Sequence, residues 1–129
     1  MLPICRDQGI GVIPWSPLAR GFLAGSRGRD GQKHTTRANS DPIADSLYTD
    51  ADFDVVDQLA EVAAARAVPP AQVALAWLLH RPGVTAPIVG ASKLSHLDDA
   101  VAAVEVSLSD DEVKLLEQPY QPHPVRGHS

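Results

Sequence analysis

The sequence is poor in residues that crosslink chains or bind metals. Cys5 is the one cysteine in 129 residues, so no internal disulfide and no cysteine metal cluster can form. A lone cysteine most often packs as a small apolar side chain. No run of eighteen apolar residues and no signal-peptide pattern is present. We therefore predict a soluble, cytoplasmic protein with no metal and no membrane partner.

Positive charge is also scarce. Eleven Lys and Arg residues face sixteen Asp and Glu residues, and the net charge of −5 argues against general nucleic-acid binding. Five of the eleven basic residues nevertheless fall between positions 20 and 37, namely Arg20, Arg27, Arg29, Lys33 and Arg37. This asymmetry indicates a local anion site or, alternatively, a solvated loop whose charges bind nothing specific.

The sequence does contain two short apolar runs, at residues 10–15 and 84–89. Each is too short for a helix, and the first is rich in β-branched residues without a period of two, which is typical of strands covered on both faces. Both end in small residues, Ser16 in one case and Gly90 to Ser92 in the other. Parallel strands bind ligands at such carboxyl ends, and a ligand with phosphates fits best.

Helical patterns surround these runs. We expect helices at residues 2–8, 50–67, 71–80, 94–104 and 110–117, with caps at Thr49 and Ser109 and a left-handed closure at Gly9. Residues 26–48 show neither a helical nor a strand period, so we expect a loop there. Residues 119–129 are expected to form an irregular tail. This order is that of an α/β protein, but two strands alone do not make a sheet that can bury both faces.

Four motifs in order resemble the aldo-keto reductase family, in its bacterial NADP-dependent oxidoreductase branch. They are WSPLARG at 15–21, PPAQVALAWLLHRPGV at 69–84, PIVGASKLSHLDDA at 87–100 and LSDDEVKLLEQPYQPH at 108–123. The family folds as a (β/α)8 TIM barrel, for which about 250 residues are typical. The resemblance implies that residues 1–129 are an incomplete C-terminal part of such a barrel, its last two strands with their helices, and that residues 26–48 cover the cofactor.

The resemblance also implies NADP(H) as the cofactor. Trp15 would lie against the nicotinamide ring, although a core aromatic at a strand end is the alternative. The other implied cofactor contacts are Ser16, Pro17, Leu18, Ala19 and Arg20 along the pyrophosphate, Arg37 over the cofactor, Gly90, Ser92, Lys93 and His96 around the 2′-phosphate, and Asp99 at the adenine. Asp99 has an alternative role too, as a first-turn charge that favours the helix dipole.

No segment matches the family's catalytic Asp, Tyr, Lys and His motifs, so no catalytic residue is assigned. We expect the cofactor-binding C-terminal part of an NADP-dependent reductase of small carbonyl compounds, inactive alone. Its partners would be NADPH, the substrate and the missing N-terminal barrel half. Two alternatives stay open: a non-catalytic module of reductase ancestry that senses cofactor or binds a partner, and a truncated remnant without function.

Overall fold

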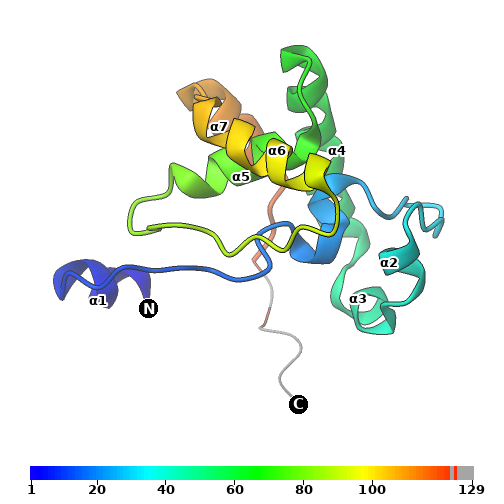
Figure 1. Cartoon of the computed structure of the whole chain (residues 1–129), viewed down its shortest axis with the longest axis horizontal. Helices are drawn as coiled ribbons and strands as arrows, with labels where there is room; N and C mark the ends of the chain where they lie inside the picture. The colour runs from blue at the N-terminus through cyan, green and yellow to red at the C-terminus, as the bar shows by residue number, and fades with distance from the viewer. Residues whose placement is uncertain (123, 125–129) are drawn as a thin grey trace.

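The computed structural model describes residues 1–122 and residue 124, apart from the side chains of residues 45 and 46. Within that part of the chain the regular secondary structure is entirely helical (Figure 1). The helices are α1 (Leu2–Asp7), η1 (Ala19–Ala24), α2 (Thr36–Asn39), α3 (Pro42–Leu47), α4 (Asp50–Arg66), α5 (Pro70–Leu79), α6 (Leu94–Ala102), η2 (Ala103–Glu105) and α7 (Asp110–Glu117).

The core forms where α4 packs against α5. Leu59, Val62 and Ala63 of α4 are buried in one cluster with Val73 and Ala74 of α5. Helix α4 begins after the predicted cap at Thr49, whose backbone N–H donates to Asp52 at 2.8 Å. Helix α5 begins at Pro70, one residue before the predicted start. The apolar face of α4 therefore builds the core, with Leu59, Val62 and Ala63 all buried.

Helix α7 is fixed to this core by apolar and ionic contacts. Leu116 joins the buried cluster, and Leu108 packs against it. Arg66, in the last turn of α4, donates from Nε and Nη2 to the two carboxylate oxygens of Glu112. Glu112 also accepts from the Ser109 backbone N–H at 2.7 Å, which closes the predicted capping box. Hydrogen bonding by Arg66 is the main cause that lowers the pKa of Glu112 to about 2.

The two apolar runs lie side by side and parallel, but they do not form regular strands. They meet at two isolated bridges, Val12 with Val84 and Trp15 with Ile88, with a hydrogen bond of 2.9 Å from the Ile88 N–H to the Pro14 carbonyl. Ile13 is 59% exposed and Trp15 74% exposed. The prediction of strands covered on both faces is thus wrong for this chain, because no third strand pairs with them in the described structure.

Residues 26–48 are not the irregular loop that the sequence predicts. They contain α2 and α3, and a bridge between Arg27 and Lys33. Thr35 caps α2 by accepting from the Ala38 N–H at 3.1 Å, and Asp41 caps α3 by accepting from the Ala44 N–H at 3.3 Å. Helices of four and six residues are too short to show a helical period in the sequence, which explains the error.

The other predicted helices are confirmed, with small shifts at their ends. The largest difference is the expected helix at residues 94–104, which the structure divides into α6 and the short η2. No single helix in the described residues is long and apolar enough to cross a membrane. Helices α4 and α5 reach that length and hydropathy only when taken together, and the chain bends by 101° between them. Most of the tail predicted to be irregular, residues 123 and 125–129, lies outside the described structure.

The helical core gives a first prediction. Leu59 is 3% exposed, so Leu59→Ala should leave a cavity and lower the free energy of unfolding by about 2–5 kcal/mol. Leu115, which is 43% exposed on α7, is the control, and Leu115→Ala should change the free energy by about 0.5 kcal/mol at most. Urea unfolding followed by circular dichroism measures both; equal losses would mean that the core lies elsewhere.

The link between Arg66 and Glu112 gives a second prediction, on pH. The folded-state pKa of Glu112 lies below its ordinary value of 4.5, so the stability that the pair contributes is fully present above about pH 4.5. It is lost as the pH falls toward 2. The difference in unfolding free energy between the wild type and Glu112→Gln should therefore shrink over this range, and a pH-independent difference would contradict the assignment.

Candidate functional site

The first predicted cofactor segment, residues 15–20, is a loop with an unusual backbone. Ser16, Ala19 and Arg20 all have positive φ angles, of 52°, 49° and 58°. Non-glycine residues seldom adopt this conformation, and each instance costs on the order of 1–3 kcal/mol. Two hydrogen bonds hold the loop in place, from the Arg20 N–H to Ser16 Oγ at 3.3 Å and from the Tyr48 hydroxyl to the Ala19 carbonyl at 2.7 Å.

The Arg20 guanidinium is bound within the chain. Its Nε and Nη2 donate to the two carboxylate oxygens of Asp41 at 2.6 and 3.1 Å, a bidentate pair. Hydrogen bonding by Arg20 is the main cause that lowers the pKa of Asp41, and the same bond raises the pKa of Arg20. Asp41 is buried. Arg20 therefore fastens the 16–20 loop to the start of α3 and does not point to an open phosphate site.

The neighbouring basic side chains are also held by the protein. Arg27 is buried, and its Nη2 donates to the carbonyls of Ala38 and Asp41 at 2.9 and 3.0 Å. Arg29 donates to Asp54 at 2.8 Å and to Asp57 at 2.7 Å. Most of the basic cluster at residues 20–37 thus serves to attach this segment to η1, α3 and α4. Arg37 differs, because its side chain is exposed on α2.

An aromatic group supports the same segment from inside. The rings of Phe22 and Tyr48 stack with centroids 4.2 Å apart, and Phe53 of α4 meets Phe22 edge-on at 4.8 Å. Burial raises the pKa of the Tyr48 hydroxyl. Leu18 and Leu23 pack against the α4 and α5 core. The predicted pyrophosphate segment is therefore packed against the helical core.

The second predicted segment, residues 90–99, is open to solvent. Gly90, Ser92, Lys93 and His96 are all exposed, with Lys93 at the N-cap of α6 and Ser92 Oγ 3.5 Å from His96 Nδ1. The side chain of Asp99 lies deeper and accepts a hydrogen bond from Gln72 Nε2 at 2.9 Å. Ser92, Lys93 and His96 are thus brought together, whereas Asp99 is engaged with α5.

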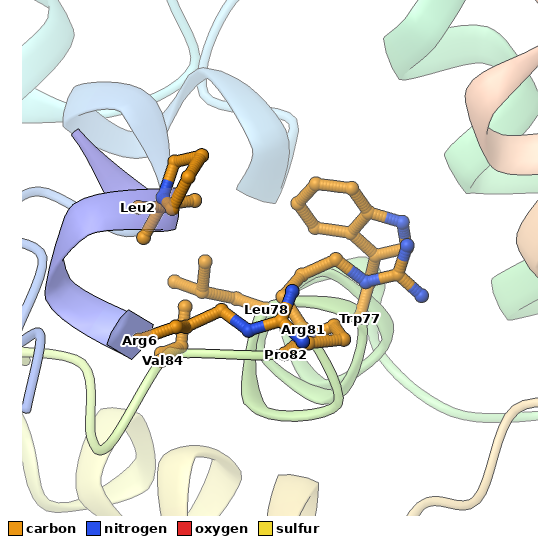
Figure 2. Close-up of a pocket in the computed structure, with 8 residues that line it drawn as sticks. Leu2, Arg6, Trp77, Leu78, Arg81, Pro82 and Val84 are labelled. Atoms are coloured by element: carbon orange, nitrogen blue, oxygen red, sulfur yellow. The ribbon is translucent and has the colours of Figure 1, made fainter. Parts of the chain in front are cut away.

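The bridge between Trp15 and Ile88 places both predicted segments at the same end of the paired runs. The two cavities described, of about 340 and 160 Å³, lie elsewhere, and none of the twelve predicted cofactor residues lines either. The larger lies between α1 and the end of α5 (Figure 2). The described residues contain no group of three or more His, Cys, Asp or Glu suited to a metal. The predicted cofactor residues thus lie outside these two cavities, and their role stays a prediction.

Sequence reasoning missed Asp41 and Tyr48, which hold Arg20 and Ala19 in place. One signal was present for Asp41: an aspartate directly before Pro42 is a typical helix start, with Asp at the N-cap and Pro at the first helical position. Tyr48 carries no such signal. Its partner is the Ala19 carbonyl, 29 positions away in the sequence.

Comparison with known proteins identifies the family. The model of the aldo/keto reductase family matches residues 1–121. The chain belongs to the aldo/keto reductase family. It is 42% identical over 132 residues to an aldo-keto reductase of Fusarium vanettenii and 37% identical over 126 residues to versiconal hemiacetal acetate reductase of Aspergillus parasiticus. These alignments cover 100% and 97% of the chain but 34% and 36% of the relatives.

A solved structure supports the fold relation. The thermostable aldo-keto reductase Tm1743, crystallised with the inhibitor epalrestat, matches with a TM-score of 0.61 and 27% identity, over 92% of this chain and 33% of that protein. The chain therefore spans about a third of the length of its relatives. Its fold corresponds to a fragment of the family's barrel, and the family are oxidoreductases that generally use NAD(P)H with carbonyl substrates.

The comparisons correct the main functional prediction. They show a fragment of an aldo-keto reductase, and they do not place it at the C-terminal, cofactor-binding end of the barrel. The description of this chain as the cofactor-binding C-terminal part of an NADP-dependent reductase is therefore wrong. In this chain the Arg20 guanidinium is paired with Asp41, and Trp15 faces solvent. The bacterial branch is not shown either, because the relatives named above are fungal.

The pair of Arg20 and Asp41 gives a third prediction. Asp41→Ala removes both the bidentate ion pair and the α3 cap, so residues 26–48 should open more often. Trypsin, which cleaves after Lys and Arg, should then cut at Arg29, Lys33 or Arg37 several-fold faster than in the wild type. Asp98→Ala, at an exposed position of α6, is the control and should leave the cleavage rate unchanged. Equal rates for both variants would show that the ion pair does not hold this segment.

Proposed function

We propose that this chain is a partner-binding module of reductase ancestry that carries out no chemistry alone. Its partner is the remaining part of an aldo-keto reductase barrel. The observation that supports the proposal is a set of exposed apolar side chains on the two paired runs. This paired-run surface consists of Ile10, Ile13, Trp15, Ile88 and Val89, each between 36% and 74% exposed.

The backbone of the paired runs supports the same conclusion. In the described structure the N–H groups of Gly11, Ile13 and Trp15 have no hydrogen-bond partner. Unpaired N–H and carbonyl groups along an extended segment form a template for a further strand. A neighbouring strand would satisfy these groups, as parallel strands are satisfied inside a closed barrel.

The energetic argument favours a large apolar partner. Each large apolar side chain that passes from water into a packed interface contributes about 1.5–3 kcal/mol. Five such side chains represent a gain comparable with the whole stability of a domain, about 5–15 kcal/mol. The relatives are about three times as long as the matched stretch, with 34–36% covered. The rest of such a barrel has the strands and helices that this surface lacks.

Cofactor binding belongs to the assembled barrel in this proposal. The family generally uses NAD(P)H. We propose that Trp15, Ser92, Lys93 and His96 contact NADP(H) once the barrel is complete, because these exposed groups lie at one end of the paired runs. A hydroxyl, an ammonium and an imidazole at the start of α6 suit a phosphate group. The chain would then sense cofactor only together with its partner.

A binding experiment is the fourth prediction. The partner is the Fusarium vanettenii aldo-keto reductase with the stretch aligned to this chain removed. Mixed with the chain, it should form a 1:1 complex, detected by size-exclusion chromatography with light scattering. Reduction of an aldehyde with NADPH by the complex, but by neither part alone, would be the accompanying activity.

Two variants test whether the paired-run surface carries the binding. Ile13→Asp places a charge at the centre of this surface and should abolish the complex, because a buried unpaired carboxylate is costly. Leu115→Asp, on α7 away from the paired runs, should leave the complex intact. Absence of any complex with the wild type, or equal effects of both variants, would reject the proposal and favour a remnant without function.

A further inference from the structure

We propose that the cavity between α1 and the end of α5 binds an amphipathic carboxylate, a molecule with an apolar body and one negative charge. The cavity measures about 340 Å³, within the usual range of small-molecule sites. None of the predicted cofactor residues lines it, and it lies at the opposite end of the paired runs, beside Val84. The proposal is independent of the function proposed above.

The walls of the cavity are apolar. Leu2 of α1, Leu78 of α5, and Pro82 and Val84 of the following segment surround it (Figure 2). Pro3 of α1 also lines the cavity. Trp77 closes one side with its indole ring. A flat or branched hydrocarbon body gains free energy by replacing water against such walls. These residues specify the apolar part of the ligand but not its charge.

Two arginines, Arg81 and Arg6, border the same cavity, and they differ in how many of their side-chain N–H groups have a hydrogen-bond partner. Arg81 donates from Nη1 to Glu117 at 2.6 Å and lies over the Trp77 ring at 4.9 Å, and its Nε–H has no partner in the described structure. Glu117 also accepts from Trp77 Nε1 at 3.0 Å. The single carboxylate of Glu117 is therefore shared, and Arg81 keeps unused donor capacity.

Arg6 has no hydrogen bond or ion pair from its side chain to any described residue. The aliphatic part of the Arg6 side chain packs on Gly83, in the turn after α5. The contact is close: a Cβ atom built on Gly83 would lie 3.2 Å from Arg6 Cγ. Asp7, the adjacent acidic residue, accepts from Gln8 instead. The cavity thus has two guanidinium groups and one carboxylate at its edge, an excess of one positive charge. A ligand carboxylate beside Arg6 would balance it with a charge-assisted hydrogen bond.

The test uses the full chain with Trp15→Phe, which leaves Trp77 as its one tryptophan. 4-Phenylbutyrate and its neutral isostere 4-phenylbutyramide are titrated separately, and Trp77 fluorescence reports binding in the cavity. We expect the carboxylate to bind roughly tenfold more tightly than the amide, as one charge-assisted bond implies. Arg6→Met should remove this preference while the amide still binds with unchanged affinity.

Arg29→Met is the matched control, because Arg29 does not line this cavity and pairs with Asp54 and Asp57 of α4. This variant should keep the full preference for the carboxylate. Equal affinity of the wild type for both compounds, no change of Trp77 fluorescence with either, or loss of the preference in Arg29→Met would each overturn the proposal. A circular dichroism spectrum of every variant confirms that the helices are retained.

Discussion

The apolar contact between α4 and α5 is the interaction on which the other parts of the structure depend. It buries Leu59, Val62 and Ala63 against Val73 and Ala74, and other segments attach to this cluster one by one. The segment after the first apolar run packs on the cluster through Leu18 and Leu23, and α7 packs on it through Leu116. Because these contacts run between helices and the segments next to them, they form without a sheet.

The same arrangement explains why the paired runs are left incomplete. They are joined to each other through Val12, Val84, Trp15 and Ile88, but no further strand covers their edges in the described part of the chain. In an aldo-keto reductase barrel every strand has two neighbours and a covering layer of helices. A chain that spans about a third of its relatives retains the helices that fold locally and exposes the surface that needs the remainder.

Local signals in the sequence were enough for the long helices and their caps. Thr49 with Asp52 and Ser109 with Glu112 are capping boxes that depend on neighbouring residues only. The strands could not be predicted correctly, because strand burial depends on partners that are distant or absent. The partner of Arg20 could not be predicted for a related reason. Arg20 binds Asp41 across 21 positions, and no local pattern in the sequence indicates such a tertiary contact.

The central claim is that the helical core folds by itself, whereas the paired runs need a partner to complete their hydrogen bonds. Hydrogen exchange of the backbone amides of the chain alone tests this claim most directly. We predict slow exchange throughout α4 and α5 and fast exchange at Gly11, Ile13 and Trp15, whose N–H groups have no partner in the described structure. Protection of these three amides equal to that of the helices would contradict the account, because it would mean that the paired runs already belong to a complete sheet.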